Sequence, residues 1–109
     1  MRSRPFVVQL TREAEKDLER LRSGTDRAIE ALLALESNPD AGHPLKGSLH
    51  GARSLEFSLP GGAHRAVYLV LEAEQVCLVF LVGPHEGLYQ KADRRMAALR
   101  RTGRTQRTR

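Results

Sequence analysis

An arginine, a histidine and a tyrosine flank two apolar runs in the second half of the chain. Arg65 opens one run, His85 follows the next, and Tyr89 comes shortly after His85. Since adjacent antiparallel strands place the beginning of one beside the end of the other, we expect Arg65 and His85 to meet at one sheet edge. Histidine titrates near neutral pH, and arginine binds phosphate through two N–H groups. These types suit metal-free cleavage of RNA, which needs a base for the 2′-hydroxyl, an acid for the leaving 5′-oxygen and a cation on the phosphate.

Other charged side chains surround this group in the sequence. Lys46 lies in a loop rich in glycine and proline, and Arg53 stands at the entry to the strand that follows the loop. His64 precedes Arg65, and neighbouring residues of a strand point to opposite faces, so only one of the two can enter the site. We expect Arg65 to be that residue.

Each member of the group also has a plain structural interpretation. Arg65 can be an exposed residue at a strand end, and His85 can be an ordinary turn residue. Tyr89 can simply pack a helix onto the sheet. The residue types alone therefore leave both interpretations open.

Other kinds of chemistry have little support. The chain has neither a phosphate-binding loop of the G-x-x-x-x-G-K-[ST] type nor a G-x-G-x-x-G turn. Its lone cysteine, Cys77, lies inside an apolar run and is expected in the core. The histidines lack the spacing of a zinc site; they are His43, His50, His64 and His85. We expect no metal and no organic cofactor.

The first elements that must position these residues are a strand and two helices. A β-branched and aromatic run predicts a strand over residues 6–10. Thr11 is a plausible N-cap, and apolar residues at helical spacing predict a helix that ends near Leu21. A second helix follows a cluster of capping residues at 23–26 and ends at Asn38-Pro39. The two form an antiparallel helical pair.

The rest of the chain changes from a helical period to a period of two. Residues 37–51 form a loop, and alternation then predicts a strand around residues 54–59. Strands over 65–71 and 76–82 follow, the last one apolar on both faces as a central strand would be, and a helix is expected from 87 or 88 to about Leu99. The order is β-α-α-β-β-β(-α). This predicts an α+β fold with a mostly antiparallel sheet packed against the two N-terminal helices.

Composition favours one domain in the cytoplasm with a basic end. The chain has 109 residues, one cysteine and a net charge of +5, and seven arginines without any acid follow position 93. Subtracting those seven charges leaves −2 for residues 1–93. We expect a single domain over 1–100 and a basic, disordered tail over 101–109. The tail suits a polyanion or an acidic protein, and it can equally be a merely solvated segment.

Several motifs together resemble the RelE/ParE toxin superfamily, over roughly residues 5–96. The order and spacing of these motifs carry the resemblance more than any single one. They are Leu45-Lys46-Gly47, Leu55-Glu56-Phe57, His64-Arg65-Ala66-Val67-Tyr68, the run from Val82 to Tyr89, and Lys91-Ala92-Asp93-Arg94-Arg95.

The resemblance implies an activity and assigns roles. The RelE-like branch of the superfamily cleaves mRNA in the ribosomal A site, and a co-encoded antitoxin silences each toxin. Arg65 would bind the scissile phosphate and His85 would be the acid or base. Tyr89 would stack on a base or orient the 2′-hydroxyl. Lys46, Arg53, His64 and Lys91 would contact RNA.

The chain departs from RelE on the strand before Arg65. Glu56 and Ser58 stand there in place of lysines. Glu56 would then be an alternative base, although its charge also repels phosphate. Two alternatives to a ribosome-dependent mRNA endoribonuclease stay open. One is a ParE-like inhibitor of DNA gyrase, and the other is a non-catalytic binding module. For a toxin we expect a hetero-oligomer with an antitoxin, whose disordered and often acidic segment wraps the fold.

Overall fold

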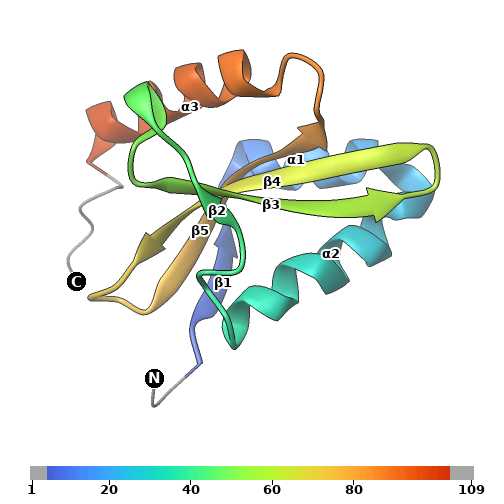
Figure 1. Ribbon diagram of the computed structural model, residues 1–109, viewed down its shortest axis with the longest axis horizontal. Coiled ribbons are helices and arrows are strands. Elements are labelled where there is room, and N and C mark those ends of the chain that lie inside the picture. The colour runs from blue at the N-terminus through green and yellow to red at the C-terminus, as the bar shows by residue number, and fades with distance from the viewer. Residues whose placement is uncertain (1–4, 104–109) are drawn as a thin grey trace.

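A mixed sheet of five strands forms the middle of the molecule, and helices cover both of its faces (Figure 1). The computed structural model describes residues 5–103. Its elements are β1 (Val7–Leu10), α1 (Arg12–Arg20), η1 (Arg22–Gly24), α2 (Thr25–Leu33), η2 (Ala34–Glu36), β2 (His43–Pro44), η3 (Gly47–Leu49), β3 (Ala52–Leu59), β4 (Gly62–Leu71), β5 (Val76–Pro84) and α3 (Leu88–Thr102). The strand order is β1-β5-β4-β3-β2, with β1 parallel to β5 and the other neighbours antiparallel. The predicted α+β class is confirmed.

Helices α1 and α2 pack on one face of the sheet. Thr11 caps α1 as predicted, because its hydroxyl accepts a hydrogen bond of 3.1 Å from the backbone N–H of Ala14. The helices bury Ala14, Leu18, Ala28 and Leu32 against the strands. The result is the predicted helical pair beneath the sheet.

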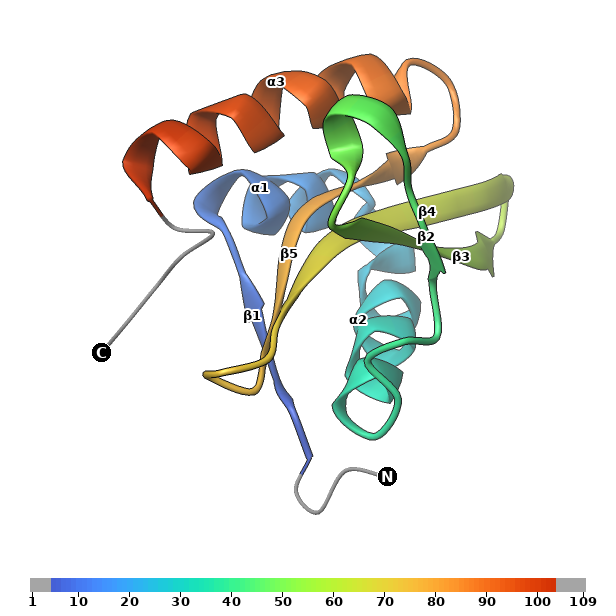
Figure 2. The same ribbon diagram turned by 60° about the vertical axis from the view of Figure 1, so that its left-hand side comes forward.

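Helix α3 covers part of the opposite face (Figure 2). Its buried residues follow one stripe of the helix: Leu88, Ala92, Met96 and Leu99. The helix runs to Thr102, beyond its predicted end near Leu99, and Gly103 then ends it with a left-handed φ of 77°. The first residues of the predicted tail are therefore helical. Residues 104–109 of that tail lie outside the described residues.

The strands are longer than predicted, which moves the candidate site. The β3–β4 ladder extends to the pair Leu59 and Gly62, so the hairpin turn is only two residues long. Gly61 takes a φ of 105° in this turn, a conformation that favours glycine. Arg65 is consequently the fourth residue of β4, paired with Glu56 on one side and Gly83 on the other. It lies inside the sheet between β3 and β5, next to the end of β5, and this is where it meets His85 as predicted.

Strand β5 lies inside the sheet, as predicted, between β1 and β4. All its residues from Val76 to Gly83 are buried, and Cys77 is fully buried among the residues facing α1 and α2. The breaker-rich segment 37–51 is not wholly a loop, because it contains β2 and η3. No helix among residues 5–103 is long and apolar enough to cross a membrane.

Candidate active site

The register of three strands places the candidate residues. Glu56 of β3 pairs with Arg65 of β4, and Arg65 pairs with Gly83 of β5. Cross-strand partners share a face, and this is the face that α3 covers, since Val67, two residues after Arg65, packs against α3. The connection from β5 to α3 then brings His85 and Tyr89 onto the same face.

Arg65 is the centre of this cluster. Its Nη1 lies 2.8 Å from Nδ1 of His85 and 3.2 Å from the hydroxyl of Tyr89. Its Nη2 lies 3.5 Å from the Glu56 carboxylate. The rings of His85 and Tyr89 meet edge to face, with centroids 6.0 Å apart. The four residues predicted to form the catalytic group therefore lie together.

The hydrogen bonds fix how His85 holds its proton. Because a guanidinium has only donors, Nδ1 of His85 accepts from Arg65, and a neutral ring carries its proton on Nε2. The Arg65 side chain is 20% exposed and that of Glu56 is 49% exposed. Among the described residues, Nε of Arg65 is buried without a hydrogen-bond partner. The cluster is thus a partly exposed cation beside a carboxylate, an imidazole and a phenol.

A tight turn holds His85 and Tyr89 in place. Gly87 has a φ of 68° just before α3, and the backbone N–H of Leu88 donates to the carbonyl of His85 at 3.2 Å. Leu88 is buried under the sheet face and anchors the helix start. Tyr89 is half-buried and packs beside the same core, so its ring has a structural as well as a candidate chemical role.

The four predicted RNA-binding residues do not join the cluster. His64 points to the opposite face, as alternation requires, where Nδ1 lies 3.1 Å from the Gly62 carbonyl and the ring lies near Phe57. Lys46 is exposed before η3, and Lys91 is exposed on α3. Their contacts with RNA stay predictions.

Arg53 has structural contacts that its sequence context does not reveal. It is paired with Tyr68, which packs against α1 and α2, so it lies on the face opposite Arg65. Its guanidinium donates to the carbonyls of Gly42 and Asp40 at 2.8 and 3.1 Å. Arg53 therefore ties the β2 segment to the sheet, whatever else it binds.

A buried tyrosine holds the same segment from beneath. The Tyr68 hydroxyl donates to the Pro39 carbonyl at 2.6 Å and accepts from the backbone N–H of Gly42 at 3.0 Å. Burial is the main cause that raises the pKa of Tyr68 above its usual value, against the opposing effects of Gly42 and Arg53. This residue stood in the family motif, but the sequence did not show its structural role.

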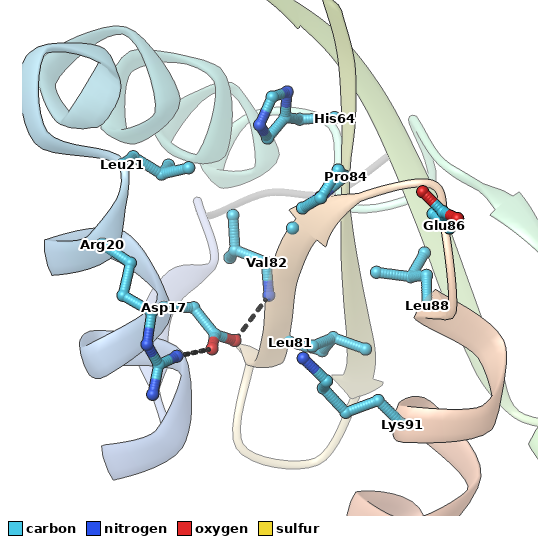
Figure 3. A pocket seen from close by; sticks show the side chains of 11 residues that line it. Asp17, Arg20, Leu21, His64, Leu81, Val82, Pro84, Glu86, Leu88 and Lys91 are labelled. Atoms are coloured by element: carbon cyan, nitrogen blue, oxygen red, sulfur yellow. Dashed lines mark hydrogen bonds and ion pairs between the residues drawn. The ribbon is translucent and has the colours of Figure 1, made fainter.

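An ion pair between Asp17 and Arg95 was also missed. Asp17 is 4% exposed and accepts from Arg95 at 2.6 and 3.2 Å. It also accepts from the backbone N–H of Val82 at 3.0 Å (Figure 3). Arg95 also donates to the Phe80 carbonyl at 3.0 Å. The pair joins α1, β5 and α3. The available signal was an aspartate on the apolar stripe that holds Ala14 and Leu18.

The basic C-terminal segment is therefore partly used inside the fold. Besides Arg95, Arg100 donates to the carbonyls of Ser48 and His50 and ties α3 to the η3 segment. Residues 5–103 contain no group of three or more side chains that could hold a metal ion.

Comparison with known proteins places the chain in a family. A model of the ParE-like toxins of type II bacterial toxin–antitoxin systems matches residues 7–93. A comparison with curated proteins finds no match.

Several solved structures share the fold. The RelBE2 toxin–antitoxin complex of Mycobacterium tuberculosis matches with a TM-score of 0.65 and 24% identity, over 72% of this chain and 96% of that one. A double mutant of the Escherichia coli toxin RelE in the free state matches with a TM-score of 0.65 and 20% identity, over 82% of this chain and 93% of that one. The YoeB/ParE toxin of Agrobacterium tumefaciens matches with a TM-score of 0.60 and 24% identity, over 73% of this chain and 99% of that one. The chain therefore belongs to the ParE-like toxins of type II bacterial toxin–antitoxin systems, within the RelE/ParE superfamily.

Proposed function

We propose that this toxin is a metal-free endoribonuclease that cleaves mRNA on the ribosome. The observation that carries the proposal is the single guanidinium, Arg65, in contact with an imidazole, a phenol and a carboxylate. Cleavage by attack of the 2′-hydroxyl needs a cation on the phosphate, a base and an acid, and this cluster contains each type.

The roles follow from which contacts a phosphate would replace. Phosphate is a bidentate partner for arginine and competes with Glu56 and His85 for the Arg65 N–H groups. Glu56 would then be free to accept the proton of the 2′-hydroxyl while the 2′-oxygen forms its bond to phosphorus. Release from Arg65 also frees Nδ1 of His85 for a second proton, and the imidazolium donates to the departing 5′-oxygen. The products are a 2′,3′-cyclic phosphate and a 5′-hydroxyl.

Tyr89 acts by position in this scheme. Its hydroxyl accepts from Arg65 and keeps the guanidinium in place before phosphate binds. Its ring is available to stack on a base next to the cleaved bond, a contact worth about 1–3 kcal/mol in other proteins. Lys46, exposed just before η3, would add a phosphate contact outside the cluster.

The partner in this proposal is a co-encoded antitoxin. The matched solved structures include toxin–antitoxin complexes of M. tuberculosis and E. coli, one of the latter with an antitoxin peptide. An acidic segment would complement the exposed arginines of α3. The cytoplasm, where mRNA is translated, is the proposed location.

The test is a cell-free translation reaction with mapping of mRNA ends by primer extension. We expect cuts only when ribosomes are present, lost in Arg65→Ala and retained in Arg27→Ala, which removes an exposed arginine of α2. Thermal unfolding of both variants controls for folding. Intact mRNA at saturating wild-type protein would refute the nuclease.

Inhibition of DNA gyrase is the second candidate, favoured by the ParE-like description of the matching family model. This activity requires binding and no catalytic group. Toxicity that survives substitution of Arg65, His85 and Tyr89, together with inhibition of supercoiling by purified protein, would establish it. Loss of toxicity in folded variants supports the nuclease.

A further inference from the structure

A second site lies beside the Arg65 cluster, on the other side of the β5–α3 connection. It is a cavity of about 300 Å³ between the end of α1, the outer edge of β5 and the start of α3 (Figure 3). We call it the notch. The residues used in the argument are Asp17, Arg20, His64, Pro84, Glu86 and Lys91, all of which line it.

The notch exists because β1 is shorter than β5. β1 pairs with β5 only as far as Val79, so the outer edge of β5 beyond that residue has no neighbouring strand. Asp17 accepts from the backbone N–H of Val82 at this edge, and Pro84 has no N–H to offer. The edge is thereby closed to strand addition, and what lines the cavity is mostly side chains.

The charges of the notch favour an anion. Asp17 is neutralised by Arg95 and also accepts from Nη1 of Arg20 at 3.0 Å. Arg20 is nevertheless 68% exposed, and a guanidinium has five N–H donors, so a held arginine still presents donors to the cavity. Lys91 adds a second exposed cation from α3, on the opposite wall. Because Arg95, which does not line the notch, already neutralises Asp17, the two cations Arg20 and Lys91 face one remaining carboxylate, Glu86.

One short segment serves both sites. Along the β5–α3 connection and the first turn of α3, His85 and Tyr89 contact Arg65, whereas Glu86 and Lys91 line the notch. On β4 the same division separates Arg65 from His64, which lines the notch. A polyanion held on Arg65 therefore has to cross only this connection to reach Arg20 and Lys91.

We propose that the notch binds a second phosphate of the RNA strand that is held on Arg65, through Arg20 and Lys91. The inference rests on the proposed nuclease function and names how the substrate is held. A strand fixed at two phosphates is held in one direction across the cluster, so the notch contributes to where the cut falls.

The test is binding of a short single-stranded RNA with 2′-O-methyl groups, which cannot be cleaved by 2′-hydroxyl attack, followed by fluorescence anisotropy over a salt series. The logarithm of the binding constant falls linearly with the logarithm of the salt concentration, and each lost phosphate contact should make this slope less steep by about 0.7. We expect this reduction in Lys91→Gln and in Arg20→Gln. We expect none in Arg27→Gln, whose arginine lies on α2 away from the notch.

Glu86→Gln supplies a change of opposite sign. Removing a carboxylate that faces the anion should tighten RNA binding, which a merely structural role of Glu86 does not predict. Arg20→Gln leaves Asp17 its bonds to Arg95 and Val82, so the fold is retained, and Lys91→Gln alters an exposed side chain with no bond to Asp17.

The outcomes separate the two proposals. Wild-type protein that binds no RNA at low salt would overturn the notch, whereas the nuclease is tested separately by the cleavage reaction with ribosomes. Binding that depends on Arg65 but has the same salt slope in Lys91→Gln and Arg20→Gln would overturn the notch alone. If Lys91→Gln and Arg20→Gln bind RNA as the wild type does but no longer bind the co-encoded antitoxin, the notch is a site for the protein partner and the proposal is overturned.

Discussion

Arg65 and His85 lie 20 positions apart in the chain, yet the guanidinium donates to Nδ1 of the imidazole across 2.8 Å. The bond joins β4 to the β5–α3 connection and holds His85 in one tautomer. It also means that the cation and the titratable group of the candidate site are not independent. Substitution of either one alters the other.

Arg65→Lys should abolish cleavage almost as completely as Arg65→Ala. A lysine keeps the charge but cannot hold Glu56 and His85 with separate N–H groups of a rigid fork or bind phosphate in two places. Primer extension in the cell-free translation reaction measures the loss. Cleavage by Arg65→Lys at the wild-type rate would show that only charge matters here.

Tyr89→Phe should reduce cleavage less than Tyr89→Ala. The phenylalanine keeps the ring that packs beside the core and is available to stack on a base, and it loses only the hydroxyl bonded to Arg65. Rates of mRNA cleavage for the two variants, compared at equal folded fraction, check this order. Equal losses would mean that the hydroxyl itself takes part in the reaction.

His85→Ala should lower the cleavage rate by about 10²–10⁴-fold, the usual contribution of a general acid or base. Single-turnover cleavage rates of the variant and the wild type provide the measurement. An unchanged rate would assign the proton transfer elsewhere.

Asp17→Ala should destabilise the fold by about 3–5 kcal/mol, because it leaves the partly buried Arg95 without its counter-ion and the N–H of Val82 without an acceptor. Urea unfolding of the variant and the wild type measures this change in the free energy of unfolding. Arg20→Ala is the control, since its side chain is largely exposed and its pairing with Asp17 is worth about 0–1 kcal/mol. Similar losses in both would contradict the central role given to Arg95.

Stability should fall at alkaline pH because of Tyr68. The pKa of this phenol is raised in the fold by burial, so the folded state prefers the protonated form. Its contribution is fully present below the unfolded value of about 10 and is lost as pH rises through the higher folded value. Tyr68→Phe should lower stability at neutral pH by about 1–3 kcal/mol, through the unpaired N–H of Gly42, and should weaken the alkaline loss. Urea midpoints at neutral and alkaline pH test both statements.

Much of the fold could be predicted, because its signals are local. Alternation in β3, a two-sided apolar run in β5 and the Thr11 cap each follow from neighbouring residues. The meeting of Arg65 with His85 followed from antiparallel pairing alone. Glu56 joined them because register fixes its partner, and this register becomes visible only once both strands and their turn have the right length.

What could not be predicted depends on contacts between distant segments. Asp17 and Arg95 lie 78 positions apart, and Arg95 looked like one of several arginines in a basic run. Arg53 looked like a free cation, but its partners are backbone carbonyls of a loop that only the folded β2 segment places beside it. Charge in a sequence shows that a partner is needed without showing whether that partner is RNA, a carbonyl or a buried carboxylate.

The parallel pairing of β1 with β5 has a consequence for the order in which the fold assembles during synthesis. The first strand can pair only after residues 76–79 have been synthesised, and His85 and Tyr89 follow later still. A nascent chain therefore has no assembled Arg65 cluster until β5 and the start of α3 have left the ribosome. The order of the strands thus makes the candidate site form late in synthesis, after the helices α1 and α2 have been made.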